Sequence, residues 1–251
     1  MVVSRETLAG LRVALPRLKS DDAIAAALKT GGAQVDTFAL TQTIPIESAQ
    51  LEQMRQRLAS GYYAWVVLSS WRAAQAVLPQ LNALALAPTS APTLNSPTSA
   101  PTHLAVVGQS TADWVNTHCA LKPTLVGAGS AAKLLEVFPT PPTATTAAAS
   151  TTAIPTICLP QSQLAAPTLA QGLSQLGWQV DAVATYTTAP LPQLPAHLKT
   201  QWQAGAWDAV VVTAGSSAQA LLQLLGPPPK KTAVVSIGQS TSARCRELGL
   251  R

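Results

Sequence analysis

Short apolar runs alternate with amphipathic segments of helical length along most of the chain. The run LRVALP at 11–16 has the length and composition of a buried strand, and segment 21–32 has the periodicity of a helix that ends at a Gly-Gly pair. The same alternation continues through a strand at 33–40, a helix at 47–60, strands at 64–70, 103–108 and 124–128, and helices at 71–81, 109–118 and 130–138. This order predicts parallel sheets with helices on both faces.

The second half of the chain repeats four blocks of the first half in the same order. TICLPQ matches RVALPR, and GWQVDAVATY matches GAQVDTFALT. DAVVVTAGSSAQALLQLL matches AWVVLSSWRAAQAVLPQL, and SIGQSTS matches VVGQSTA. Four matched blocks in one order indicate a diverged tandem duplication. The second half stops soon after its last block, so we expect its C-terminal strand and helix, the counterparts of 124–138, to be missing.

Two segments, 86–103 and 139–156, fall outside this pattern. Neither contains an Asp, Glu, Lys or Arg, and together they hold eight of the 20 prolines, which disfavours both helix and sheet. We interpret them as low-complexity insertions that act as solvated spacers.

The charge and the cysteines narrow the class of protein. The formal net charge is +5, but the basic residues are scattered, so we expect no nucleic-acid partner, although a small polyanionic ligand is favoured. Cys119, Cys158 and Cys245 are isolated and predict neither disulfides nor a metal site. No export signal and no long apolar span is recognisable, so we expect a cytoplasmic protein without membrane contact.

The sequence Gly-Gln-Ser-Thr occurs twice, each time where a strand is expected to end and a helix to begin with Ser or Thr. A helix start leaves backbone N–H groups unpaired at the positive end of the helix dipole, where carboxylates and phosphates bind. The turns at 69–70 and 213–217 have the same character, and in parallel sheets such turns share one edge. The alternative is that each hydroxyl merely caps its helix. A nucleophile elbow is disfavoured because its fifth position is Ala112 or Ser242 rather than Gly.

The order of these blocks, together with TLVGAGSAAKLLEVF and the extended block GWQVDAVATYTTAP, resembles the uroporphyrinogen-III synthase family over nearly the whole chain outside the insertions. The resemblance implies two flavodoxin-like α/β domains joined by a two-stranded linker. One domain would comprise 1–40 and 190–251, and the other 41–189. The implied activity is cyclisation of linear hydroxymethylbilane to uroporphyrinogen III, with loss of water and inversion of ring D, in tetrapyrrole biosynthesis. The enzyme would use no cofactor and no metal, and we expect a monomer.

The resemblance also implies site residues. Tyr186 matches the family's tyrosine at the second linker strand and would donate a proton to the departing hydroxyl, unless it only packs at the domain junction. Arg17 would pair with a substrate carboxylate. The other expected substrate-binding residues lie in the turns: Ser69, Ser70, Gln109, Ser110, Thr111, Thr213, Ser216, Gln239, Ser240 and Thr241.

The sequence departs from the family pattern at three residues as well as in the expected loss of the last strand and helix, and two other functions stay open. Gln161 stands where the family often has an arginine, Ala214 replaces a usual hydroxyl, and Trp71 is unusual in its turn, where it would either narrow the site or stack on a pyrrole. The alternatives are a non-catalytic two-domain protein that binds a small anion and an inactive, truncated homologue.

Overall fold

The computed structural model describes residues 7–86, 101–142 and 154–250, and the chain divides into two compact units. Unit 1 comprises Met1–Ile44 and Thr188–Arg251, and unit 2 comprises Pro45–Thr187. The expected insertions at 86–103 and 139–156 fall mostly outside the described residues. Within the described ranges, no helix is long and apolar enough to cross a membrane.

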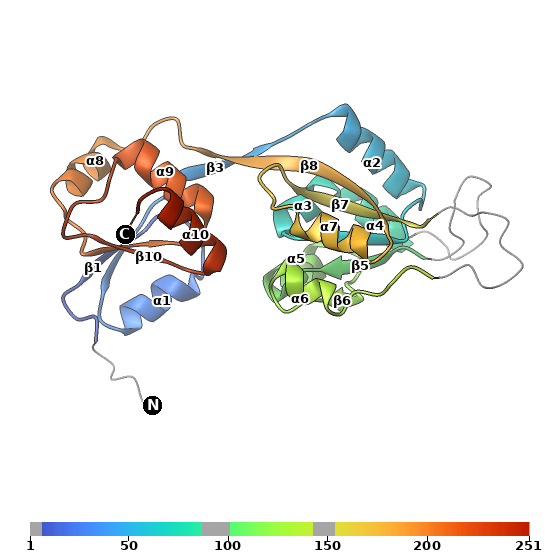
Figure 1. Cartoon of the computed structure of the whole chain (residues 1–251), viewed down its shortest axis with the longest axis horizontal. Helices are drawn as coiled ribbons and strands as arrows, with labels where there is room; N and C mark the ends of the chain where they lie inside the picture. Colours follow the sequence, from blue (N-terminus) through green and yellow to red (C-terminus); the bar gives the residue numbers. More distant parts are fainter. Residues whose placement is uncertain (1–6, 87–100, 143–153, 251) are drawn as a thin grey trace, which may run out of the picture. The chain divides into compact units, whose positions relative to one another are not determined.

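Unit 1 is built on a parallel four-stranded sheet in the order β10-β9-β1-β2. Its strands are β1 (Arg12–Leu15), β2 (Gln34–Thr37), β9 (Ala209–Val212) and β10 (Ala233–Ser236). Its helices are α1 (Ala23–Thr30), α8 (Ala196–Gln203), α9 (Gly215–Leu225) and α10 (Gln239–Glu247). Alternate residues of β1 face opposite sides: Val13 and Leu15 pack with α1, whereas Ala14 packs with α8 and α9 (Figure 1).

Unit 2 contains a larger sheet in the order β3-β8-β7-β4-β5-β6. Its strands are β3 (Thr41–Pro45), β4 (Trp65–Leu68), β5 (His103–Val106), β6 (Leu125–Val126), β7 (Thr156–Ser162) and β8 (Gln179–Pro190). Its helices are α2 (Ala49–Ala59), α3 (Trp71–Ala76), α4 (Leu78–Leu86), α5 (Gln109–His118), α6 (Ala131–Leu135) and α7 (Thr168–Gln175). The pairs from β8 to β6 are parallel. The hydrogen bonds Ile46 N to Thr185 O and Leu191 N to Leu40 O make β3 antiparallel to β8, and both strands cross the boundary between the units.

The matched blocks of the two sequence halves occupy equivalent places in the two sheets. In unit 1, β9 and β10 of the second half lie beside β1 and β2 of the first half. In unit 2, β4 and β5 of the first half lie beside β7 and β8 of the second half. Each sheet therefore joins strands from both halves, and the expected parallel α/β architecture is confirmed. In the described part of the chain, β6 and α6 extend unit 2 beyond β5, whereas the sheet of unit 1 ends at β10.

The prediction of a single helix at 71–81 is wrong. The structure has two helices there, α3 and α4, which are separated by Val77. Proline has no N–H to donate to the carbonyl four residues back, and its ring clashes with that carbonyl, so one continuous helix through Pro79 is disfavoured. Pro79 is tolerated because it lies in the first turn of α4, where an N–H would have no partner inside the helix.

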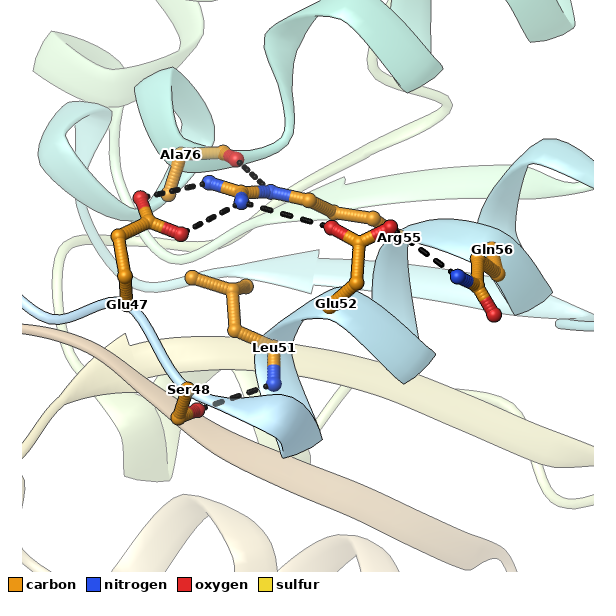
Figure 2. Close-up of polar contacts among 7 residues, drawn as sticks. All are labelled: Glu47, Ser48, Leu51, Glu52, Arg55, Gln56 and Ala76. Carbon is orange, nitrogen blue, oxygen red and sulfur yellow. Dashed lines mark hydrogen bonds and ion pairs between the residues drawn. The ribbon is translucent and has the colours of Figure 1, made fainter.

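Arg55 ties α2 to the end of α3 (Figure 2). Its Nε donates to the carbonyl oxygen of Ala76 at 3.1 Å, and its two terminal nitrogens donate to the two carboxylate oxygens of Glu47 at 2.7 and 3.1 Å. Ser48 caps α2 by accepting a hydrogen bond from Leu51 N at 3.1 Å. These contacts fix α3, which follows the predicted turn at 69–70.

A partly buried network holds β8 against the rest of unit 2. The fully buried Tyr63 donates a hydrogen bond to Oδ2 of Asp181 on β8, and Arg57 of α2 pairs with the same oxygen at 3.2 Å. Burial, and then the hydrogen bond to Asp181, raise the pKa of the Tyr63 phenol well above its ordinary value. The phenol therefore keeps its proton and acts as a permanent donor to β8.

We predict that Tyr63→Phe destabilises the protein by about 1–2 kcal/mol, because the Asp181 carboxylate loses a buried hydrogen-bond donor. Tyr62→Phe is the matched control, since the phenol of Tyr62 makes no hydrogen bond with a described residue. The free energies of unfolding are measured by urea titration. Equal stability of the two variants would show that the network does not hold β8.

Candidate functional site

The register of β7 and β8 places Tyr186 at one edge of the unit 2 sheet. Seven residues of β7 pair with β8, and an irregularity between Gln161 and Ser162 puts Ser162 opposite Tyr186. Because β4, β7 and β8 are parallel, the turn that follows β4 at Leu68 lies at the same edge.

Ser70 is the hydroxyl that meets Tyr186 at this edge. Its Oγ lies 3.0 Å from Oη of the half-buried Tyr186, and it also accepts a hydrogen bond from Ala73 N at 3.2 Å. Ser70 was expected to bind substrate, but its side chain caps α3 and contacts the tyrosine. The neighbouring Ser69 is exposed and makes no hydrogen bond with a described residue.

The helices that begin at the other three predicted turns are α5, α9 and α10. Their N-cap residues are Gly108, Ala214 and Gly238, and none of these three helices has a side-chain cap. Ser70 therefore caps its helix and contacts Tyr186 as well, whereas at the other three turns no hydroxyl caps the helix.

In α5 and α9 the third N–H already donates to the N-cap carbonyl, from Thr111 to Gly108 and from Ser217 to Ala214, each at 3.1 Å. The N–H groups of the first two residues of α5, α9 and α10 remain available to an anion.

Both N-cap glycines are required by geometry. Gly238 has a φ of +84°, in the left-handed region that favours glycine. Gly108 has extended backbone, but a Cβ there would lie 3.0 Å from the Cα of Gly129.

The two Gly-Gln-Ser-Thr copies fold alike. Both helices begin at the glutamine, and the first spans Gln109–His118, the range expected for it. In each copy the glutamine and serine are exposed and the threonine is buried, so Gln109, Ser110, Gln239 and Ser240 can reach a ligand, whereas the burial of Thr111 and Thr241 argues against direct contact. The Gln109 amide is engaged, because its Nε2 donates to Asp113 Oδ1 at 2.7 Å.

In unit 1, the predicted Arg17 is held by Asp22. The guanidinium donates to the two carboxylate oxygens at 2.5 and 2.6 Å, and Oδ1 of the same carboxylate also accepts from the first-turn nitrogens of α1. The Arg17 hydrogen bonds, supported by those from the helix, lower the pKa of Asp22 to about 2, although its burial acts in the opposite direction. Arg17 is thus oriented by its own chain. Thr213 and Ser216, at the start of α9, are half-buried.

The structure also has a cavity that lies apart from these turns. A cavity of about 630 Å³ in unit 1, lined by Asp36, Phe38 and Trp207 among others, contains none of the predicted site residues. The described residues include no cluster of three or more His, Cys, Asp or Glu side chains that could hold a metal.

Comparison with known proteins shows the family and the fold of this chain. A family model described as uroporphyrinogen-III synthase HemD matches residues 22–251. The chain belongs to the uroporphyrinogen-III synthase family. A mutant uroporphyrinogen III synthase from the extremely thermophilic bacterium Thermus thermophilus shares its fold, with a TM-score of 0.58, 18% identity, and coverage of 96% of this chain and 90% of that one. A synthetase from Helicobacter pylori aligns with a TM-score of 0.56, 14% identity and the same coverage of both chains. The search of curated proteins found no significant match.

The candidate residues of this synthase-family chain form two sets, each within one unit. Unit 2 carries Ser69, Ser70, Gln109, Ser110, Thr111 and Tyr186, and unit 1 carries Arg17, Thr213, Ser216, Gln239, Ser240 and Thr241. Sequence reasoning missed the acidic partners Asp22 and Asp113. The first had a usable signal, because an aspartate just before an apolar helical segment is a favoured cap.

We predict that Asp22→Asn lowers stability near neutral pH by on the order of 2 kcal/mol, as expected when a carboxyl pKa falls from 3.8 to about 2 on folding. Asparagine also caps helices, so the variant isolates the ion pair with Arg17. Since the folded pKa is depressed, the stabilisation is present above about pH 4 and is lost as the pH falls through 2. Urea unfolding of both proteins should show the difference shrinking over that window, and a difference independent of pH would contradict the assignment.

Proposed function

We propose that this chain converts hydroxymethylbilane to uroporphyrinogen III, with Tyr186 as the proton donor. The observation that carries the proposal is the contact of Tyr186 with Ser70, at a sheet edge where α5 also begins uncapped, in a chain of this family. The reaction begins when the hydroxyl of the hydroxymethyl group leaves as water, for which its oxygen must receive a proton, and the methylene carbon stays behind as the electrophile. Ring D then attacks through its substituted carbon to give a spiro intermediate, which reopens and closes with the ring inverted.

The contact between Ser70 and Tyr186 allows either hydroxyl to donate. In the proposed mechanism Ser70 donates, because its Oγ accepts the N–H of Ala73 and its own proton can point at the Tyr186 oxygen. The phenol of Tyr186 then keeps its proton for the departing hydroxyl. As the proton transfers, Ser70 stabilises the phenolate that forms.

The uncapped helices supply the means to hold the substrate. Hydroxymethylbilane carries eight carboxylates, and the starts of α5 in unit 2 and of α9 and α10 in unit 1 offer backbone N–H groups to such anions. Exposed side chains at two of these starts, Gln109, Ser110, Gln239 and Ser240, extend the donor set. The bilane closes spontaneously without inversion, so much of the catalysis is positioning that excludes the uninverted route.

The chemistry and the cysteines support two further parts of the proposal. The reaction involves no redox step and no group donor, so it needs no cofactor, and we propose that the chain acts as a monomer. Its three cysteines are free and buried, which supports a reducing compartment such as the cytoplasm.

The test is to supply freshly generated hydroxymethylbilane to the purified chain, oxidise the products, and measure type III against type I uroporphyrin by chromatography. We expect an excess of type III over the control without enzyme. The uncapped helix starts would equally let a non-catalytic protein bind a small anion. Only type I from folded protein would favour that alternative or an inactive homologue.

We predict that Tyr186→Phe lowers kcat by about 10²-fold with little change in KM, because a general acid acts in the transition state. Initial rates of type III formation measure both constants, and circular dichroism checks the fold. An unchanged kcat would remove Tyr186 from the mechanism.

We predict that Ser70→Ala lowers kcat, whereas Ser48→Ala does not. Each serine caps a helix of unit 2, so each substitution should cost about 1 kcal/mol of stability, but only Ser70 contacts Tyr186. Ser70→Thr keeps the hydroxyl and should recover most of the rate. Equal kinetics in the two alanine variants would show that Ser70 acts only as a cap.

A further inference from the structure

The two residues that follow Ser70 form an exposed aromatic and cationic pair. Trp71 begins α3 and is 37% exposed, which is unusual for a side chain with so large an apolar surface. It lies next in sequence to the serine that contacts Tyr186.

The indole of Trp71 is supported by α5. Its ring centroid lies 6.0 Å from that of Trp114, which packs against the core of unit 2. Trp114 stacks in turn on His118, with 4.4 Å between centroids and 12° between planes. Trp114 therefore holds the Trp71 indole in place on one side, while the rest of the indole surface is exposed to solvent.

Arg72 lies over the Trp71 indole, with its guanidinium carbon 4.5 Å from the ring centroid. Consecutive residues of a helix do not normally face one another, so the arginine side chain has turned back over the ring. Stacking uses the face of the guanidinium and leaves the N–H donors along its edge available.

Those donors have no protein acceptor in the described structure. Arg72 forms neither a hydrogen bond nor an ion pair with a described residue. By contrast, five other arginines pair with an aspartate or glutamate: Arg12, Arg17, Arg55, Arg57 and Arg244. Arg72 is a pre-positioned cation whose charge is not balanced locally.

We propose that the Arg72 guanidinium, stacked on the Trp71 indole, binds one carboxylate of hydroxymethylbilane next to the Tyr186 edge. The proposal rests on the function proposed above and adds a substrate-binding residue to that site. A planar guanidinium fits a carboxylate through two parallel hydrogen bonds, and its fixed position lowers the entropy lost on binding. The exposed part of the indole offers apolar contact to the pyrrole that carries the carboxylate.

The test compares Arg72→Gln, Arg72→Lys and Trp71→Leu with the wild-type chain. We expect Arg72→Gln to raise KM about tenfold with little change in kcat, as the loss of a charged hydrogen-bond pair predicts. Arg72→Lys keeps the positive charge but lacks the planar guanidinium, so its KM should lie between those of the wild type and Arg72→Gln. Trp71→Leu should raise KM about threefold, because the arginine loses its platform. Arg246→Gln is the control, since Arg246 is also exposed and unpaired among the described residues but lies in the last turn of α10.

A second measurement separates this inference from the proposed reaction. Porphobilinogen, a single pyrrole with an acetate and a propionate, is titrated into each protein by calorimetry, and circular dichroism verifies folding. We expect about tenfold weaker binding to Arg72→Gln than to wild type and Arg246→Gln. If the wild type makes only type I product, the proposed function fails while the titration still decides the role of Arg72. Equal behaviour of Arg72→Gln and Arg246→Gln in KM and in porphobilinogen affinity, or no binding to any of them together with an unchanged KM, would overturn the inference.

Discussion

The chemistry proposed here depends on the parallel pairing of β8 with β7. This ladder brings Tyr186 to the edge where the turn after β4 presents Ser70, which is 116 positions away in sequence. A shift of one residue in the pairing would turn every side chain of β8 to the opposite face and remove the tyrosine from the serine. The Asp181 contacts, five residues earlier on the same strand, oppose such a shift, because Tyr63 and Arg57 would both lose their acceptor.

Helix capping divides the strand-to-helix turns into two classes. Where Asp22, Ser48 or Ser70 caps a helix, the chain satisfies its own N–H groups and stabilises itself. At α5, α9 and α10, glycine or alanine at the N-cap leaves the first two of these groups free. A capping serine typically contributes about 1 kcal/mol, and an anion at a helix start contributes a similar amount. The uncapped starts therefore give up local stability, and bound substrate carboxylates would restore it.

Local patterns in the sequence were enough to predict the α/β architecture and the turns, because strand and helix periods and the repeated blocks are short-range signals. The break between α3 and α4 was missed, although Pro79 marked it. The burial of Thr111 and Thr241 could not be predicted from the motif, because the packing of each helix against its sheet decides which of its side chains are buried. The Ser70 to Tyr186 contact had no local signal, because a long-range strand pairing creates it.

The proposed proton donor and the proposed carboxylate anchor place two different demands on the same edge of unit 2. A proton donor to the leaving hydroxyl works through a short, directional contact, which the rigid sheet and the capped start of α3 provide. A carboxylate anchor works at longer range and must tolerate the motion of a flexible bilane, which a stacked guanidinium on an exposed helix start allows. Because Ser70, Trp71 and Arg72 are consecutive, one short turn fixes the spacing between the two functions. Misplacing that turn would impair proton transfer and substrate binding together, whereas removing either side chain alone affects only one of them.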